Sequence, residues 1–374
     1  MKNVAVIFGG KSVEHDISII TALQTMKNIS KNYKLYPIYI KPDGKFIIAE
    51  NLTDAKTYLN FNKNVRKAKV VSFLLGTPTL MIMKNGKVKE YVNIDCAILC
   101  NHGHGGEDGS LQGLLELCEI PYSSCDVRSS VLCMDKVLTK IMLKNAKIAS
   151  PTYVYFDICQ YKARKINILK NIVDQIKFPC IVKPATLGSS IGINVCENEQ
   201  ELISSIDDAF VYDDKIIVEQ FVSKAREFAC AVFKIDDKLF TSKVQEMKKG
   251  KIYTFQEKYL CQKEREVREI TKQLDERIKK YAMASYSALQ CDGIVRVDFL
   301  YNEKQNKLYV NELNSIPGSL AFNLFSSSFV DLINSLISEA ISRNEKKKQI
   351  CYEFNSQAIE NYIAMTDHLK YKMS

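Results

Sequence analysis

Apolar and polar positions alternate along residues 1–125 in a way that predicts strands and helices in turn. Short apolar runs bounded by turn residues indicate strands, and apolar positions three or four apart indicate helices. This alternation is typical of an α/β domain with a mainly parallel sheet. The predicted strands are Val4–Phe8, Lys34–Ile40, Val70–Leu75 and Cys96–Cys100, and the predicted helices are Ser18–Ile29 and Leu111–Leu117.

Beyond residue 125 the pattern changes and predicts two further domains and a tail. Residues 215–260 alternate in a way that predicts antiparallel strands, which is typical of an α+β region. We expect domains at 1–125, 126–213 and 214–345, and a tail at 346–374 whose structure the pattern does not predict. The predicted strands are Tyr153–Phe156, Phe178–Lys183, Ile191–Cys196, Ile216–Glu219, Glu227–Ile235, Lys238–Val244 and Ile252–Thr254, and the predicted helices are 165–177, Glu199–Ala209, Arg265–Leu289 and Phe329–Ile341.

Composition excludes several classes of protein. The 374 residues are 46% hydrophobic and 25% charged, which is ordinary for a globular protein. No run of about 18 apolar residues predicts a membrane helix, and the apolar start of the chain reads as a core strand rather than a signal peptide. The net charge of +9 is spread widely, so nucleic-acid binding is weakly indicated, and binding of an anionic nucleotide fits the charge equally well.

The twelve cysteines lie mostly inside apolar runs, and no CxxC pair occurs. A zinc site or a disulfide framework is therefore not predicted, and buried free thiols in a reducing cytoplasm fit the pattern better.

Four polar residues stand two apart on two neighbouring strand-like runs: Arg296 and Asp298, then Glu312 and Asn314. Residues i and i+2 of a strand share a face, so a hairpin would bring all four side chains to one side. Two carboxylates and an amide oxygen suit Mg²⁺, and an arginine suits a phosphate or an oxyanion. An exposed sheet face with ordinary surface polar residues is the alternative.

A glycine- and serine-containing loop, Lys183–Gly192, lies between two predicted strands. Glycines let backbone N–H groups approach phosphate oxygens, and the serines and Lys183 add donors, although a structural turn would also explain the glycines. A P-loop is excluded at Gly9-Gly10-Lys11-Ser12, because Ala5 stands where its first glycine is required.

Two further glycine-rich turns follow predicted strands, where ligands of α/β sheets bind. Residues 101–113 carry His102, His104, Glu107 and Asp108, but no third soft ligand is nearby for a metal. Glu14 follows the first strand, where it could stabilise a helix start or bind a substrate ammonium. Glu219 stands at the end of a predicted strand, and Glu227 follows eight residues later. The strand end could bind an adenine and a carboxylate could bind a ribose, although exposed glutamates near strand ends are common.

Taken together, these motifs resemble those of the D-alanine–D-alanine ligases of the ATP-grasp superfamily. The resemblance runs in order from residue 4 to about residue 325. It implies a Rossmann-like parallel-sheet domain followed by a two-part ATP-grasp fold. The motifs are Gly9-Gly10-x-Ser12-x-Glu14-His15-x-x-Ser18, His102-Gly103-x-x-Gly106-Glu107-Asp108-Gly109-x-x-Gln112-Gly113, Lys183-Pro184-x-x-x-Gly188-Ser189-Ser190-x-Gly192, Arg296-x-Asp298 and Glu312-x-Asn314-x-x-Pro317-Gly318.

The family's reaction phosphorylates the carboxylate of one D-alanine with ATP, and the amine of a second D-alanine then attacks the acyl phosphate. By matching position, Lys136 and Lys183 contact the phosphates or the adenine. Glu219 and Val222 line the adenine pocket, and Glu227 binds the ribose. The full set of ATP-binding residues implied is Lys136, Lys183, Ser190, Glu219, Val222, Glu227 and Lys258.

The resemblance also implies the catalytic and substrate-binding residues. Glu14 holds the ammonium of the first D-alanine, and His102 lies near its carboxylate. Arg296 and the backbone N–H of Gly318 stabilise the tetrahedral oxyanion. The resemblance implies that Asp298, Glu312 and Asn314 bind two Mg²⁺ ions, or Mn²⁺ in their place. It also implies that Ser189 and Tyr259 are catalytic. Tyr259 and Lys258 would belong to a loop, Tyr253–Arg265, that closes over the site.

One stretch departs from the family pattern. Where the family carries a serine for the carboxylate of the second substrate, this chain has Asn323, within Ser319–Asn323. The leading hypothesis is a cytoplasmic, homodimeric D-alanine–D-alanine ligase of peptidoglycan synthesis, without nucleic-acid or membrane partners. A related ATP-grasp ligase with a different second substrate and a nucleotide-binding protein without catalysis are the alternatives.

Overall fold

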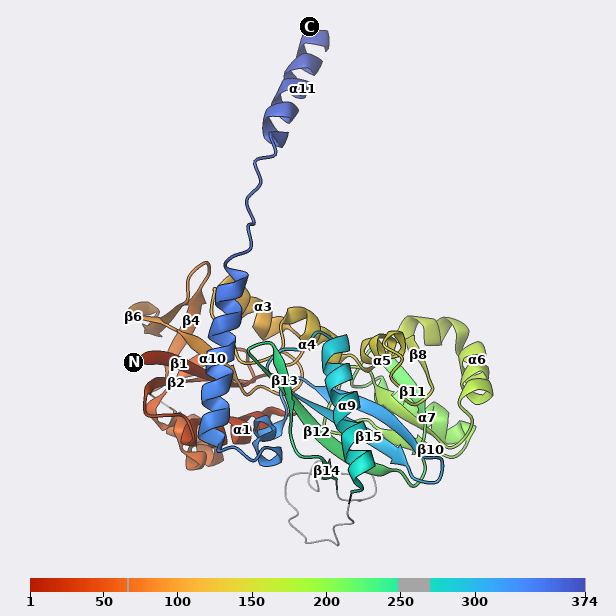
Figure 1. The fold of residues 1–374 in the computed structure, drawn as a ribbon. Helices are drawn as coiled ribbons and strands as arrows, with labels where there is room; N and C mark the ends of the chain where they lie inside the picture. Colours follow the sequence, from red (N-terminus) through yellow and green to blue (C-terminus); the bar gives the residue numbers. More distant parts are fainter. Residues whose placement is uncertain (66, 248–269, 374) are drawn as a thin grey trace. The chain divides into compact units, whose positions relative to one another are not determined.

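A computed structural model describes residues 1–65, 67–247 and 270–373 (Figure 1). The chain divides into a large compact unit, Met1–Ile341, and a small one, Ser342–Ser374. The large unit holds three β-sheets, and the division of these residues into three domains stays a prediction. Among the described residues, no helix is both long and apolar enough to cross a lipid bilayer.

The first sheet confirms the α/β class expected for the N-terminal part. Its strands run in the order β6-β5-β4-β3-β2-β1-β7, and the parallel pairs are β1 with β2 and β1 with β7. The remaining strands extend it antiparallel, so the expected parallel sheet is only its central part. The strands are β1 (Lys2–Gly9), β2 (Tyr33–Ile40), β3 (Phe46–Ile48), β4 (Lys69–Leu74), β5 (Thr79–Lys84), β6 (Lys87–Asn93) and β7 (Cys96–Leu99).

Burial explains which strands of this sheet were predictable. Val4–Phe8 of β1 is completely buried and reads as a continuous apolar run, as central parallel strands do. In β6, by contrast, only Val92 is buried, so the strand leaves almost no apolar pattern. The helices and short helical turns of this part are α1 (His15–Lys27), η1 (Glu50–Thr53), η2 (Ala55–Asn60), α2 (Phe61–Asn64) and α3 (Ser110–Leu117).

The second sheet is antiparallel, in the order β10-β9-β11-β8. One face packs under α6 and α7 in a core that includes Phe156, Val182 and Val218. The apolar pattern of α6 was recognised only from residue 165, because the backbone leaves helical geometry at Arg164. The elements are α4 (Val127–Met134), α5 (Lys136–Asn145), β8 (Tyr153–Asp157), α6 (Ile158–Gln175), β9 (Cys180–Pro184), β10 (Asn194–Cys196), α7 (Glu199–Ala209) and β11 (Lys215–Gln220).

The third sheet has the order β13-β12-β15-β16, with β14 paired to β12. Helix α9 packs with Cys230, Val295 and Val297 in the core of one face. The predicted strand Ile252–Thr254 and the start of the predicted helix at Arg265 lie outside the described residues. The elements are β12 (Arg226–Ile235), β13 (Lys238–Thr241), β14 (Gln245–Glu246), α9 (Lys272–Ala288), β15 (Ile294–Asn302), β16 (Lys307–Asn314), η3 (Gly318–Leu324) and α10 (Phe329–Lys347).

The small unit contains a helix, α11 (Ala358–Met373), in the tail for which the sequence pattern made no prediction. Its apolar residues Ile359 and Tyr362 are exposed. A helix that buries no face needs no apolar stripe in its sequence, so no such stripe marked this helix.

Candidate active site

The hairpin of β15 and β16 brings the four predicted polar residues to one face of the third sheet. Arg296 pairs with Asn314, and Asp298 pairs with Glu312, in antiparallel register. Arg296 donates from Nε and Nη2 to the two carboxylate oxygens of Asp298, each over 2.7 Å, and Asn314 Nδ2 donates to Asp298 Oδ2 over 3.2 Å. The hairpin expected from the sequence therefore forms, in a register that the spacing alone did not predict.

The neighbouring strand places small residues beside these side chains. On β12, Ala229 pairs with Asp298, and Ala231 pairs with Arg296. Both alanines are buried, and the opposite face of the sheet carries the apolar core under α9. Carboxylates on one face, flanked by small residues, form an oxygen-rich donor set that fits a hard cation such as Mg²⁺.

A β-bulge joins this hairpin to the second sheet. The register shifts between Asp298 and Phe299, and Asn311 is the extra residue on β16. Its side-chain oxygen accepts a hydrogen bond from Lys183 Nζ over 3.2 Å. Bulges redirect single side chains out of the regular alternation, and period-two reasoning therefore did not single out Asn311.

Lys183 also belongs to a buried charge cluster with Glu219 and Lys140. Glu219 Oε2 lies 3.0 Å from Lys183 Nζ, and Glu219 Oε1 lies 3.3 Å from Lys140 Nζ. Burial pushes the pKa of Glu219 up, but the two ammonium groups outweigh it and lower that pKa. Lys140 was missed by sequence reasoning, although its spacing of four from Lys136 places both lysines on one face of α5.

Lys136 reaches the predicted phosphate loop from α5. Its Nζ donates to the backbone oxygen of Leu187 over 2.5 Å. Burial lowers the pKa of Lys136 and of Lys140, and nearby carboxylates oppose that effect. Both predicted phosphate-binding lysines therefore adjoin the same loop, Lys136 through this contact and Lys183 at the end of the strand before it.

The loop between β9 and β10 touches the N-terminal part of the chain. Ser189 donates its hydroxyl to Glu14 Oε1, and both Ser189 and Ser190 have left-handed backbones. A Cβ on Gly188 would lie 2.8 Å from Glu14 Oε2, so a larger residue there would displace the Glu14 carboxylate. Thr186 anchors the loop through two hydrogen bonds to Asp213. The Ser189–Glu14 contact joins two motifs that are 175 residues apart.

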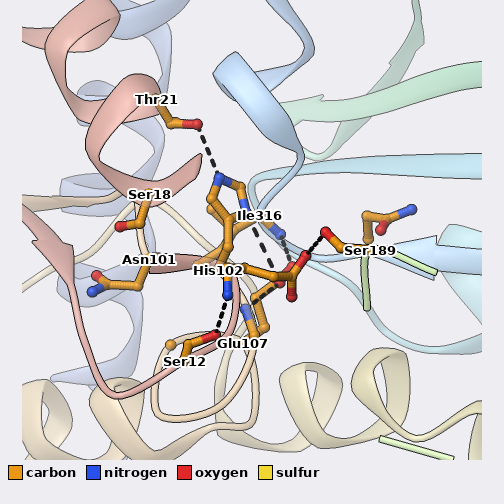
Figure 2. A network of polar contacts seen from close by, with 12 residues as sticks. Ser12, Ser18, Thr21, Asn101, His102, Glu107, Ser189 and Ile316 are labelled. Atoms are coloured by element: carbon orange, nitrogen blue, oxygen red, sulfur yellow. Dashed lines mark hydrogen bonds and ion pairs between the residues drawn. The ribbon is translucent and has the colours of Figure 1, made fainter. Parts of the chain in front are cut away.

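A second network surrounds His102, which lies between Thr21 and Glu107 (Figure 2). Thr21 Oγ1 and His102 Nε2 are hydrogen bonded over 2.9 Å, and Thr21 Oγ1 also accepts the backbone N–H of Ser319 over 3.1 Å. Glu107 accepts backbone N–H groups from Gly103 over 2.9 Å and from Ile316 over 3.0 Å. The glycine-rich turn after β7 is thus tied to the turn after β16.

Burial sets the charge state of this network. It lowers the pKa of His102 to about 4, helped by the charge of Arg296, so the imidazole is neutral at pH 7. Burial raises the pKa of Glu107 to about 8, and the charge of Glu14 adds to the rise. His104, by contrast, is exposed and lies 2.9 Å from Asp108, so the two histidines of the His-x-His sequence have different environments.

The remaining predicted residues are spread around these two networks. Val222 is half-buried, and Glu227 is exposed on β12. Gly318 begins η3, in which Ser319, Leu320 and Ala321 adopt left-handed backbones. Asn323, expected near the second substrate, is exposed, and Lys258 and Tyr259 lie outside the described residues.

Comparison with known families matches nearly the whole chain. The model described as "D-ala D-ala ligase N-terminus" matches residues 3–125, and the model "D-ala D-ala ligase C-terminus" matches residues 142–337. The D-alanine–D-alanine ligase of Thermosipho africanus is 38% identical, over 96% of this chain and 99% of that protein.

Solved structures are similar over comparable lengths. The D-alanine–D-alanine ligase of Helicobacter pylori has a TM-score of 0.76 at 30% identity and covers 91% of this chain and 98% of its own. The VanG D-Ala:D-Ser ligase of Enterococcus faecalis also has a TM-score of 0.76, at 29% identity, with 91% and 99% covered. The similarity of fold is thus equal for relatives named for two different second substrates.

Proposed function

The chain belongs to the D-alanine–D-alanine ligase family, and we propose that it joins two D-alanines with cleavage of ATP to ADP and phosphate. The expected ATP-grasp fold and the identity as an ATP-dependent ligase agree with these relatives.

The observation that supports the proposal most is that four motifs, distant in sequence, meet through three direct contacts. Ser189 of the phosphate loop contacts Glu14, Lys183 contacts Asn311 beside the polar hairpin, and Glu107 accepts the N–H of Ile316. A phosphoryl donor, a carboxylate acceptor and an attacking amine must be held together for ligation, and positioning supplies much of the rate in such reactions. A protein that only bound a nucleotide would have no need of the Glu14 and His102 networks.

We assign the nucleotide to the second sheet and the loop beside it. Lys136, Lys183 and Ser190 would hold the phosphates, with backbone N–H groups of the loop as further donors. Glu219 and Val222 would face the adenine, and Glu227 the ribose. Glu219 is already paired with two lysines, so its charge is balanced inside the protein before any ligand binds.

We assign the first D-alanine to Glu14 and His102. The carboxylate of Glu14 would pair with the substrate ammonium, and the neutral imidazole of His102 would lie near the substrate carboxylate without adding charge. The γ-phosphoryl group of ATP would then pass to that carboxylate, giving an acyl phosphate and ADP. Exclusion of water at this stage protects the acyl phosphate from hydrolysis.

In the second step, the amine of the second D-alanine would attack the acyl carbon. The tetrahedral oxyanion would receive hydrogen bonds from Arg296 and from the backbone N–H of Gly318, which are fixed donors of the kind that stabilise such charge. Phosphate then leaves with its bonding electrons, and the nitrogen loses a proton. The bidentate contact of Arg296 with Asp298 keeps the guanidinium oriented on the sheet face.

Asp298, Glu312 and Asn314 would hold two Mg²⁺ ions, or Mn²⁺ in their place. Hard oxygen ligands of this kind suit both cations, which neutralise developing phosphate charge when bound. We further propose that the enzyme acts in the cytoplasm, in peptidoglycan synthesis, and as a homodimer. The eleven described cysteines are free, which suits a reducing compartment.

A second candidate function is a ligase with a different second substrate. The segment Ser319–Asn323 departs from the family pattern, and a relative named as a D-Ala:D-Ser ligase has an equally similar fold. The ring of Phe322 stacks on that of Phe329 at 4.3 Å between centroids, which fixes one side of this segment.

One assay separates these functions: phosphate release from Mg-ATP with single D- and L-amino acids and with pairs, followed by mass analysis of the products. D-Ala-D-Ala as the main product supports the first function, and D-Ala-D-Ser or another mixed product supports the second. A folded protein that releases no phosphate in response to any amino acid would contradict both, and would favour a nucleotide-binding protein without catalysis.

A further inference from the structure

Three buried cysteines meet at a place in the fold that the ligation mechanism does not use. Cys125, Cys133 and Cys291 are at most 4% exposed, and their sulfur atoms all lie within 4.8 Å of one another. Cys133 Sγ and Cys291 Sγ are 3.6 Å apart. Within the described residues, this is the only group of three or more His, Cys, Asp or Glu side chains whose ligand atoms converge in this way.

The sulfur positions suit a thiophilic cation. Zinc–sulfur bonds of about 2.3 Å place the sulfurs of a tetrahedral site roughly 3.8 Å apart. The distance between Cys133 Sγ and Cys291 Sγ is close to that value. No sulfur–sulfur distance in the cluster exceeds 4.8 Å, so the sulfurs would need to move together only slightly to bind one ion. Soft thiolate ligands select Zn²⁺ and Cu⁺ over the hard cations that suit the oxygen-rich hairpin.

The three cysteines come from two segments that are far apart in the sequence, one around α4 and one before β15. Cys125 precedes α4, Cys133 is in the last turn of α4, and Cys291 is in the turn between α9 and β15. The backbone approaches closely here, because a Cβ on Gly293 would lie 2.6 Å from the oxygen of Ser123. A cation bound here would link the end of the N-terminal part to the strand that carries Arg296 and Asp298.

The surroundings are those of a closed site. The three cysteines belong to the apolar core that includes Leu143 and Leu289. Cys125 Sγ lies 3.4 Å from the backbone oxygen of Asp292, which adds an oxygen beside the sulfurs.

We propose that Cys125, Cys133 and Cys291 bind one thiophilic cation, Zn²⁺ or Cu⁺, in a buried structural site. Binding replaces the three thiol protons by one metal ion and releases them to solvent, without any change in oxidation state. The site holds no part of the ligation chemistry, and its role is to join the segment around α4 to the turn before β15.

The test uses the full chain, reduced and freed of metal, in excess Mg²⁺ so that oxygen sites are filled. Zn²⁺ is titrated against a chromophoric chelator, Cu⁺ against a Cu⁺-specific chelator, and Co²⁺ serves as the spectroscopic substitute for Zn²⁺. We expect one equivalent of Zn²⁺ or Cu⁺ to bind and the Co²⁺ form to show strong thiolate-to-metal charge-transfer absorption. No binding by either ion, or a Co²⁺ spectrum without that absorption, would overturn the proposal.

The variants C125S, C133S and C291S should each weaken binding by more than about 100-fold, since losing even an outer partner of a metal site costs 10- to 100-fold. The matched control is C230S, because Cys230 is completely buried in the same apolar core but lies outside the cluster. Unchanged affinity in C133S, or equal loss in C230S, would contradict the assignment. If the cluster variants do not fold, X-ray absorption on the metal-loaded wild-type chain decides: about three sulfur neighbours are expected, and oxygen and nitrogen neighbours alone would refute the site.

Discussion

Lys140 and Glu219 form an ion pair that is almost completely removed from water. The two charged atoms lie 3.3 Å apart, and the side chains are 0% and 1% exposed. Since Glu219 pairs with Lys183 as well, one carboxylate contacts two ammonium groups from two elements, α5 and β9.

Replacing Glu219 by Gln should therefore destabilise the protein strongly. The two lysines would remain buried without a counter-charge, and breaking a buried pair in this way costs about 3–5 kcal/mol. Urea unfolding without ligands measures the loss. Lys140→Met should cost less, because Glu219 keeps Lys183, and Glu197→Gln, an exposed glutamate beside the same sheet, should leave stability unchanged. A Glu219→Gln protein as stable as the wild type would show that the cluster does not stabilise the fold.

Replacing Glu312 by Gln should abolish most turnover and leave the fold intact. The change removes a carboxylate opposite Asp298 from the proposed metal set, and we expect kcat to fall at least about 100-fold, as for other lost groups that stabilise transition-state charge. Steady-state phosphate release measures it, and circular dichroism checks the fold. Glu303→Gln, on the same hairpin but exposed, is the control. Wild-type turnover in Glu312→Gln would refute the metal role.

Replacing Ser189 by Ala should weaken binding of the first D-alanine. The hydroxyl hydrogen bonds to Glu14, and losing a hydrogen bond to a charged group costs about 1.5–3 kcal/mol. We expect KM for D-alanine to rise at least about 10-fold, with a smaller change for ATP. Ser204→Ala, on exposed α7 surface, controls for the loss of a hydroxyl. An unchanged KM for D-alanine would show that the Ser189 hydroxyl does not support substrate binding by Glu14.

Glu107 should make the stability of the protein fall as pH rises from 6.5 to 8. Its folded pKa, about 8, is above its ordinary 4.5, so its contribution is fully present below 4.5 and is lost as pH rises through 8. The contribution of His102 runs the other way: with a folded pKa of about 4 against 6.5, it is present above 6.5 and lost as pH falls through 4.

Of these two groups, only Glu107 is still titrating between pH 6.5 and 8, and there the fall should amount to about 2 kcal/mol at most. Chemical unfolding at a series of pH values, without substrates, measures it. In Glu107→Gln the slope should disappear, whereas Glu90→Gln, at an exposed position of the first sheet, should keep it. If the stability of Glu107→Gln still falls between pH 6.5 and 8, another group must cause the fall.

Much of the site was predictable because its residues follow simple local rules. The shared face of Arg296, Asp298, Glu312 and Asn314 follows from spacing by two along two strands of a hairpin, and the loop after Lys183 follows from its glycines and serines. These features depend on neighbours in sequence, and their geometry is nearly fixed by the backbone.

What could not be predicted depends on contacts between distant segments. Asn311 faces Lys183 only because a bulge interrupts the alternation of β16, and Ser189 meets Glu14 across 175 residues. Strand β6 was missed because almost all of it is exposed and no apolar pattern marks it. The cysteine cluster is likewise invisible in the sequence, since residues 125, 133 and 291 have no motif spacing.

The hydroxyl of Ser189 has a further consequence, because the same short loop is assigned to ATP while its hydrogen bond goes to the group assigned to D-alanine. Under those assignments the two substrates cannot bind independently. Whatever factor ATP applies to the affinity for D-alanine, D-alanine must apply to the affinity for ATP, since coupling free energies are reciprocal. Removing the hydroxyl should therefore weaken equally the effect of ATP on the affinity for D-alanine and the effect of D-alanine on the affinity for ATP.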